Sequence, residues 1–328
     1  MKNSNQRTMI SQVKESGILS PLIIVAILLT VMLILKPNYL AATNVFVLVK
    51  VLTITAMVGF SQMIIMAIGG LNISVGAIGA LSAIIAGGAM DRLGVPAFPA
   101  LIIGILVGVA CGVVNGLLIY RAGGVGPAFF LITLATASLF QGINLTITSG
   151  NPYYGIDSKF MAYGDTQLFG LPLSFFYMLL VGLLIWFMFS KLAIGRQFLA
   201  FGANPKAAEL YGISKFRVVL YASIIAALVA AIAGMIAMIR IKTAQPNMGA
   251  DWMLLSFAAP LIGGTKLNGG KVNVAGCLLG AIALTIISNG LVHLAVDVFW
   301  NTLIYGTVIL LSVMVDQFNL AGMLRRKR

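Results

Sequence analysis

Gly202–Arg217 reads GANPKAAELYGISKFR and separates two long apolar runs in the second half of the chain. Asn204 can cap a helix, Pro205 suits the first helical position, and Lys206–Tyr211 are mostly good helix formers. Gly212 can adopt the left-handed conformation that ends a helix. The stretch therefore predicts a polar helix of about two turns, held at both ends by apolar segments. It is either a plain connector or an element that fits a groove on a soluble partner.

The composition of the chain is that of an integral membrane protein. Of its 328 residues, 60% are hydrophobic and 9% are charged, and the mean hydropathy is +1.05. Soluble globular proteins carry about 25% charged residues. Cys111 and Cys277 lie inside apolar runs, and we interpret them as small packing residues. The net charge of +13 comes from basic residues at the ends of apolar runs, so nucleic acid is not an expected partner.

Apolar runs recur along the chain and predict an all-α integral membrane protein with about ten transmembrane segments. We expect these spans at Ile18–Leu35, Val45–Ile68, Ile73–Met90, Ala97–Ile119, Ala128–Thr148, Leu168–Ser190, Val218–Ile239, Trp252–Ile262, Val274–Leu294 and Val298–Val315. Trp252–Ile262 is too short to cross about 30 Å at about 1.5 Å per residue, so some segments are expected to be short or broken. Residues 1–17 then form a polar N-terminal segment, residues 18–316 the transmembrane domain, and residues 317–328 a basic tail.

The distribution of Lys and Arg predicts the orientation of these spans. With ten crossings and the N-terminus inside, the inner segments hold fifteen basic residues and the outer segments hold six. Because basic residues concentrate on the cytoplasmic side of a membrane, both termini are expected in the cytoplasm. The same orientation places Gly202–Arg217 in the cytoplasm. The long polar loop Ser149–Gln167 is then outside.

Polar residues interrupt the apolar pattern between the second and third spans, in the stretch Gly69–Gly76 (GGLNISVG). Adjacent glycines disfavour a continuous helix, and lipid cannot satisfy polar side chains. Such a break is tolerated where it is buried in protein or lines a watery cavity. A pathway for a neutral, hydroxyl-rich solute would suit such groups, although each could equally form a hydrogen bond between helices. The candidates are Gly69, Gly70, Asn72, Ser74, Gln62, Gln141 and Asn144.

Two glycine-rich stretches have structural rather than chemical interpretations. Gly104, Gly108, Gly112 and Gly116 recur at every fourth residue, which predicts a helix face that another helix can approach closely. Gly263–Lys271 resembles a phosphate-binding loop, but Thr265 and Val272 stand where the pattern needs Gly and Ser or Thr. The sequence therefore contains no nucleotide-binding domain, and this chain is expected to bind no cofactor.

Several ordered motifs resemble the sugar-type, ribose-permease-like branch of the ABC-importer permeases, in the branched-chain amino acid/ribose permease family. They are GGLNISVGAIG (Gly69–Gly79), the segment Gly195–Gly234, and, within Ala244–Asp316, AQPNMG, LIGGTKLNGGKVNVAGCLLGA, NGL and ILLSVMVD. This chain departs from the family pattern at two places. Asn72 stands where the family usually has Asp, and Trp252–Phe257 stands where the family more often has Glu-Leu-Asp-Ala-Ile-Ala.

The resemblance implies a set of partners for a multi-pass protein of the bacterial inner membrane. Cytoplasmic ATP-binding subunits, which hold ATP and Mg, would contact the coupling loop through Ala207, Ala208, Glu209, Leu210 and Gly212. A second permease subunit, identical or homologous, would complete the pathway. An extracytoplasmic solute-binding protein would land on Ser149–Gln167. The resemblance also implies an inverted repeat, spans two to five against seven to ten. Asn-Gly-Leu stands at the C-terminal end of the fourth span (115–117), on the inner side, and of the ninth span (289–291), on the outer side, which fits that repeat.

These features favour a permease subunit of a binding-protein-dependent ABC importer that moves a sugar or sugar-like solute. The alternative is a self-contained facilitator or an ion-coupled secondary transporter of a small polar solute. All eight acidic residues fall in loops or near span ends, which argues against a coupling-ion site in the membrane. His293 is interpreted as an interfacial residue. A membrane-embedded enzyme has no support, because no paired carboxylates, metal-ligand spacing or activated nucleophile can be found.

Overall fold

The computed structural model describes residues 18–124, 126–297, 299–307, 309–310 and 314, and most of these residues are helical. The helices are α2 (Leu19–Leu35), α3 (Ala42–Ala67), α4 (Val75–Leu93), α5 (Ala97–Arg121), α6 (Pro127–Thr148), α7 (Ser158–Tyr163), α8 (Leu173–Lys191), α9 (Ala193–Ala203), α10 (Pro205–Leu210), α11 (Lys215–Ile241), α12 (Trp252–Ile262) and α13 (Val274–His293). Two short antiparallel strands, β1 (Gln167–Leu168) and β2 (Leu171–Pro172), form a hairpin. Residues 300–307 are also helical.

Seven of the described helices are long and apolar enough to cross a membrane: α3, α4, α5, α6, α8, α11 and α13. α2, with 17 residues, and α12, with 11 residues, are shorter apolar helices. The helical class and the multi-pass membrane character are therefore confirmed. The expected tenth span, Val298–Val315, is only partly described. The expected N-terminal segment 1–17 and tail 317–328 lie outside the described residues.

The helix boundaries follow the expected spans closely, with one correction. The span expected at Leu168–Ser190 begins at Leu173, because the chain first turns through Phe169 and Gly170, which have φ of 52° and 78°. Pro172 has no N–H to donate, and it stands at the position that precedes α8. The short helices α7 and α9 lie in segments for which the sequence predicted no helix.

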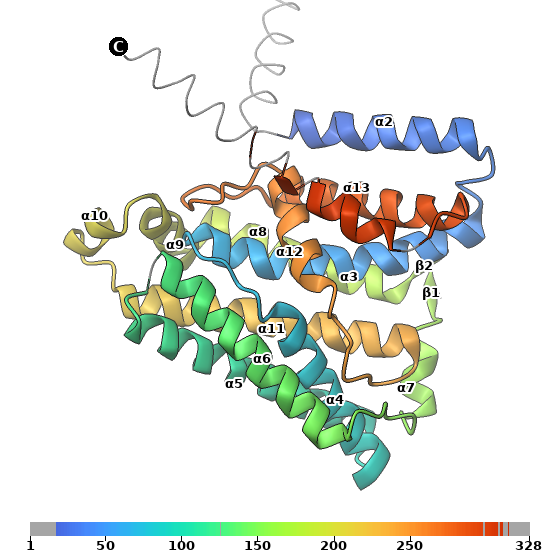
Figure 1. Cartoon of the computed structure of the whole chain (residues 1–328), viewed down its shortest axis with the longest axis horizontal. Helices are drawn as coiled ribbons and strands as arrows, with labels where there is room; N and C mark the ends of the chain where they lie inside the picture. Colours follow the sequence, from blue (N-terminus) through green and yellow to red (C-terminus); the bar gives the residue numbers. More distant parts are fainter. Residues whose placement is uncertain (1–17, 125, 298, 308, 311–313, 315–328) are drawn as a thin grey trace, which may run out of the picture.

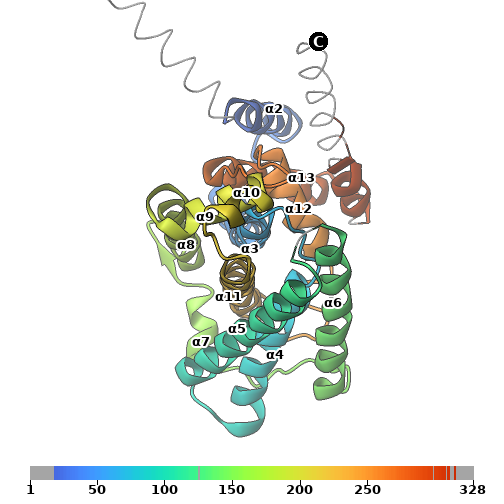
Figure 2. The same ribbon diagram turned by 90° about the vertical axis from the view of Figure 1, so that its left-hand side faces the viewer.

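Three helices form the inner layer of the molecule. In the most apolar stretch of each helix, 61% of the residues are buried in α3 and 72% in α4 and α11, against 28% in α5 and α6 and 22% in α8. α11 packs against α5, α4 and α3, and α3 also packs against α12 and α13. Seen along the helices, α3 and α11 lie centrally, with α8 and α6 on opposite sides and α2 at one edge (Figure 2). The outward-facing apolar side chains of α5, α6 and α8 suit contact with lipid.

Glycines allow α5 and α13 to pack closely against their neighbouring helices. A methyl group on any of the four regularly spaced glycines of α5 would lie within 3.0 Å of an atom of α4 or α11; these are Gly104, Gly108, Gly112 and Gly116. α13 uses the same device, because a methyl group on Gly280 would lie 2.1 Å from the Ala259 carbonyl oxygen of α12. The two cysteines, Cys111 in α5 and Cys277 in α13, are buried and unbonded to each other.

A buried polar cluster fastens the start of α3 to the end of α13. The side-chain amides of Asn44 and Asn289 exchange hydrogen bonds of 3.0 and 3.2 Å. His293 Nε2 lies 2.8 Å from Asn44 Oδ1, and the His293 ring packs edge-on against Tyr39. Burial raises the pKa of the Tyr39 hydroxyl to about 12. His293 therefore belongs to a structural cluster that holds the α2–α3 connection against α13.

Candidate functional site

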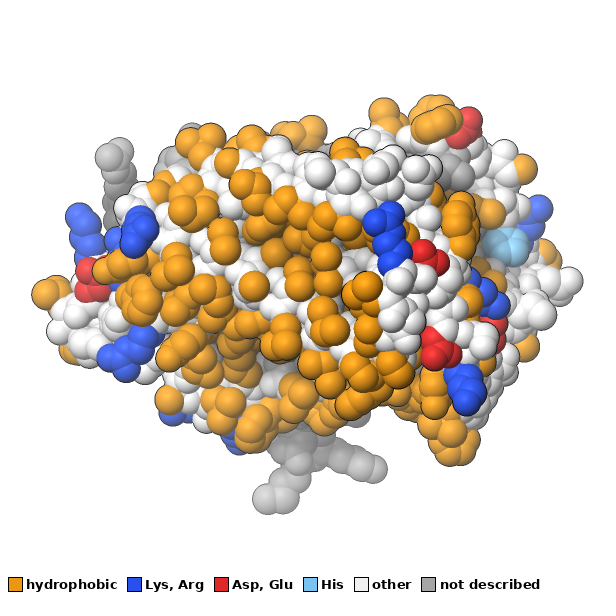
Figure 3. Space-filling view, turned by 90° about the horizontal axis from the view of Figure 1, so that it is seen from below, with side chains coloured by type: hydrophobic (Ala, Val, Ile, Leu, Met, Phe, Trp, Pro, Cys, Tyr) orange, Lys and Arg blue, Asp and Glu red, His pale blue; other side chains and the backbone are white. Residues whose placement is uncertain are grey.

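Charged side chains gather at the two ends of the molecule, with an apolar band between them (Figure 3). α10 lies at one end, and α7 with the β-hairpin lies at the other (Figure 1). The α10 end is strongly basic, since Glu209 is the only described acidic residue in its loops. The basic residues of its loops are Arg121, Lys191, Arg196, Lys206, Lys215, Arg217, Lys266 and Lys271. This asymmetry is the one that the positive-inside rule associates with the cytoplasmic face.

The helix expected within Gly202–Arg217 is present as α10. The Asn204 side chain accepts a hydrogen bond of 3.1 Å from the Ala207 N–H, and Pro205 occupies the first helical position. Gly212 has φ of 81° and ends the helix. Its N–H donates to the Glu209 carbonyl at 3.0 Å, as a left-handed helix stop requires. α10 is therefore a short helix of about one and a half turns, and both of its ends are capped.

α10 presents apolar side chains to solvent. Leu210 and Tyr211 are each 88% exposed, whereas Ala208 is buried and belongs to the main hydrophobic core. Glu209 and Gly212 border a hollow of about 470 Å³ that Lys215 and Phe216 also line. Two exposed large side chains beside a hollow suit a surface that a partner covers.

The break between α3 and α4 is a closed hydrogen-bonded structure. Asn72 Oδ1 accepts hydrogen bonds from the Ser74 N–H (2.9 Å) and the Ser74 hydroxyl (2.7 Å). In the orientation that pairs donors with acceptors, the Gln62 amide makes two bonds to the Asn72 backbone, of 3.0 and 3.1 Å. Gly69 has φ of 76°, and a methyl group on Gly70 would strike the Phe129 ring of α6 at 2.7 Å. Gln62, Asn72 and Ser74 are thus held by each other.

Two residues of this network were not singled out by the sequence as polar-path candidates. Asn115 Nδ2 of α5 donates to the Ser74 hydroxyl at 2.8 Å. Thr133 of α6 accepts from the Ile73 N–H at 3.2 Å and lies 3.0 Å from the Leu71 carbonyl. A polar residue inside an apolar span indicates a buried hydrogen bond, so both residues could have been found as candidates. Their partners could not, because Ser74 and Ile73 lie on distant segments of the sequence. The break therefore joins α3, α4, α5 and α6.

The two polar candidates on α6 lie apart from this network. Gln141 Nε2 donates to the Pro246 carbonyl (3.1 Å) and to Asn247 Oδ1 (3.0 Å), which ties α6 to the connection between α11 and α12. Asn144 is buried, and neither its amide nitrogen nor its oxygen has a protein partner. Leaving such a group unpaired costs about 1–3 kcal/mol. Asn144 is therefore the sequence candidate whose side-chain amide has no protein partner.

The opposite end of the molecule is ordered by an ion-pair bridge. Asp165, in the loop after α7, contacts Lys242 at 2.7 Å and Lys50 of α3 at 2.9 Å. Hydrogen bonds from Lys242 and then Lys50 lower the pKa of Asp165 to about 2. Tyr153 pairs with Ala244 through their backbones, so the loop 149–167 is fastened at two places. The loop is therefore attached to α3 and to the segment that follows α11.

The segment Gly263–Lys271 connects α12 to α13 and lies beside the end of α9. Its lysines border a second hollow of about 340 Å³ together with Gly202 and Ala203. The groups of three or more His, Cys, Asp or Glu that a metal ion needs do not occur among the described residues. The segment serves as a tight turn between two helices.

Comparison with known proteins identifies the family. The profile of the branched-chain amino acid transport system / permease component matches residues 41–313. The chain is 34% identical to the ribose import permease of Bacillus subtilis over 322 residues, which cover 97% of this chain and 99% of that protein. It is 32% identical to the D-allose transport system permease of Escherichia coli over 90% of each chain. The fructose import permease of Rhizobium meliloti is 30% identical over 91% of this chain and 84% of that protein.

No solved structure matches the chain. The resemblance drawn from the motifs is nevertheless confirmed, since the family profile and these relatives span nearly the whole sequence. The chain therefore belongs to the family of the branched-chain amino acid transport system / permease component.

Proposed function

We infer that this chain is the membrane-spanning permease subunit of a binding-protein-dependent ABC importer for a sugar or sugar-like solute. The observation that carries this inference is the chain-long similarity to permeases named for ribose, allose and fructose import. The chain is a multi-pass protein of the inner membrane, and a separate subunit hydrolyses the ATP. The acidic residues in the described part of the chain lie in loops or near helix ends, which fits a transporter without an ion-coupling carboxylate.

The coupling element is α10. A groove on a cytoplasmic ATP-binding subunit, which holds ATP and Mg, covers the exposed side chains of Leu210 and Tyr211 and borders Glu209. Ala207 and Ala208 hold the helix against its loop, and Gly212 sets its end. The capped ends support this role, because a rigid helix transmits a displacement of the ATP-binding subunit, whereas a flexible loop would not.

We propose the rest of the importer as the family resemblance implies it, and the charge asymmetry supports the orientation. Both termini lie in the cytoplasm after about ten crossings, and a second permease subunit, identical or homologous, completes the pathway. The extracytoplasmic binding protein lands on the loop 149–167, which the bridge at Asp165 holds in place. An inverted repeat relates α3–α6 to α11–α13 and the following helix. It is supported by glycine-mediated packing in corresponding pairs, α4 with α5 and α12 with α13.

We place the translocation path along the polar candidates, with Asn144 as the strongest. Its unpartnered buried amide suits a hydroxyl-rich solute. The network of Gln62, Asn72 and Ser74, with Gly69 and Gly70, instead shapes the wall of the path. Gln141 fixes the connection that follows α11.

Reconstitution tests the proposed function directly. The permease is placed in proteoliposomes with its ATP-binding subunits and its binding protein, and uptake of labelled ribose, allose and fructose is measured with and without internal ATP. Accumulation that needs ATP and all three components supports the importer. Uptake by the permease alone would instead establish the facilitator or ion-coupled carrier.

Side-specific labelling tests the orientation. Because both native thiols are buried, a single cysteine introduced at Lys206 is the only accessible thiol among the described residues. An impermeant maleimide should label it in inverted vesicles and leave it unlabelled in intact cells. Labelling in intact cells would place α10 outside and refute its contact with an ATPase.

A further inference from the structure

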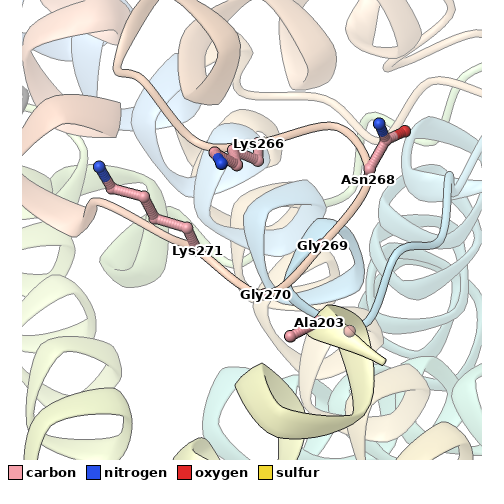
Figure 4. A pocket seen from close by; sticks show the side chains of 7 residues that line it. Ala203, Lys266, Asn268, Gly269, Gly270 and Lys271 are labelled. Carbon is pink, nitrogen blue, oxygen red and sulfur yellow. The ribbon is translucent and has the colours of Figure 1, made fainter. Parts of the chain in front are cut away.

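Three segments that are distant in sequence meet backbone to backbone beside α10. They are the end of α3 (Ala67–Gly69), the end of α9 (Gly202–Ala203) and the α12–α13 turn (Asn268–Gly270). The Gly270 N–H donates to the Ala67 carbonyl at 3.1 Å. Figure 4 shows Gly269 and Gly270 lying over Ala203 at the edge of the hollow of about 340 Å³. We call this contact the glycine junction.

Glycine is required at the junction because the backbones are in direct contact. A methyl group on Gly202 would lie 1.9 Å from the Ala67 carbonyl oxygen and 2.7 Å from the Gly270 nitrogen. A methyl group on Gly269 would lie 2.7 Å from the Gly69 nitrogen and 2.9 Å from the Gly202 Cα. Such distances leave no space for any side chain, so these segments can move only together or by parting.

The junction lies between the coupling element and the helix break. Ala203 is followed by Asn204, whose side chain caps α10. On the other side, Ala67 ends α3, and Gly69 begins the break that carries Asn72. The third segment leads directly into α13, whose start Asn273 caps by accepting from the Gly276 N–H at 2.9 Å.

We propose that the glycine junction transmits movement of α10 to the α3–α4 break, and that Gly202 is the positioning residue of this contact. A push on α10 displaces the end of α9. The end of α9 cannot shift toward Ala67 or Gly270 without moving them, because their atoms are already in contact. The displacement therefore reaches the break and its Asn72 network, and also the turn that leads into α13. This inference rests on the proposed function, since it explains how the proposed importer couples ATP use to access.

Gly202→Ala tests the junction. Gly202 has a helical backbone, so alanine costs nothing in backbone conformation and acts only as a wedge. In proteoliposomes of the complete importer, we expect solute accumulated per ATP hydrolysed to fall about tenfold, which corresponds to a coupling change in the usual range. Binding of the ATP-binding subunits and their ATPase rate should stay at the wild-type level, because the exposed face of α10 is unchanged.

Two matched variants serve as controls. Gly142→Ala replaces a helical glycine that has no atom within 4 Å of the added methyl group, and it should leave the ratio unchanged. Gly104→Ala inserts a wedge 2.3 Å from Met235 Cε, far from the junction in sequence. It should lower thermal stability and leave the ratio unchanged. An equal fall in the ratio with Gly104→Ala would refute the proposal, because any wedge would then uncouple transport.

Ala203→Gly keeps the proposal testable if Gly202→Ala does not fold. This change removes the methyl group that lies against Gly270, so it cannot create a clash. It should lower the ratio about threefold by loosening the contact. A wild-type ratio in both junction variants would overturn the proposal. Failure of the wild-type complex to accumulate solute with ATP would instead refute the proposed function, so the two failures are distinguishable.

Discussion

Truncating the exposed side chains of α10 should weaken binding of the ATP-binding subunit without harming the permease itself. Leu210 and Tyr211 are each 88% exposed, so each has nearly its whole side chain available for burial by a partner. Burying a large apolar side chain contributes about 1.5–3 kcal/mol. Since about 1.4 kcal/mol is a factor of ten in affinity, Leu210→Ala should weaken binding about 10- to 100-fold, and Tyr211→Ala similarly.

The assay is binding of the purified ATP-binding subunit to the permease in nanodiscs, with thermal unfolding of the permease alone as a second readout. Unfolding should change little, because substitution of a fully exposed side chain alters stability by about 0.5 kcal/mol or less. Phe169→Ala is the matched control. Phe169 is 90% exposed in the hairpin at the opposite end of the molecule, so its truncation should leave this binding unchanged.

Two results would refute the reasoning. Wild-type affinity in Leu210→Ala and Tyr211→Ala would show that the partner does not cover α10. Weakened binding in Phe169→Ala alone would place the ATP-binding subunit at the other end and reverse the orientation.

The remaining predictions concern stability, measured by thermal unfolding in detergent. Gly108→Leu should destabilise the permease by about 1–3 kcal/mol, because a first methyl group already lies 2.4 Å from Ala231 Cβ of α11. Asn289→Leu should cost about 1–3 kcal/mol, because it removes two buried hydrogen bonds that contribute about 0.5–1.5 kcal/mol each, while Asn44 keeps its bonds to the Tyr39 carbonyl and His293. Asp165→Asn should cost no more than about 1 kcal/mol, because its ion pairs are exposed. Its folded pKa, lowered to about 2, lies below the unfolded value of about 3.9. The difference from wild type should therefore be constant above about pH 4 and disappear as the pH falls through about 2.

Each of these stability predictions has a contradicting outcome. An unfolding midpoint of Gly108→Leu equal to that of Gly142→Leu would show that the α5–α11 contact is not close. An unchanged Asn289→Leu midpoint would mean that the amide pair contributes nothing. A wild-type advantage over Asp165→Asn that grows below pH 4 would contradict the sign of the pKa change.

The parts of the structure that depend only on residues adjacent in the sequence could be predicted from the sequence. α10 is one such part, because Asn204, Pro205 and Gly212 each act on the adjacent turn. The apolar spans were also predictable, since their length and hydropathy are properties of continuous stretches. The hairpin before α8 was missed, because Leu168, Phe169 and Leu171 extend the apolar run and conceal the turn at Gly170.

Contacts between distant segments could not be predicted in the same way. The sequence showed that Gly69 and Gly70 break a helix, but it could not show that Asn115 and Thr133 would complete the hydrogen bonds of that break. Gly202 likewise suggested a loop boundary rather than a contact with Gly270. In each case the partner comes from another helix, and only the packing of the whole bundle sets the pairing.

The concealment of both thiols makes this chain a convenient object for reporter chemistry. Cys111 and Cys277 are shielded inside helices α5 and α13, so a probe aimed at a newly introduced cysteine has no competing target there. Fluorophores or spin labels can thus be attached to introduced cysteines at opposite faces without first replacing Cys111 and Cys277. Distances between such labels would follow the opening and closing of the transporter in an otherwise unaltered protein.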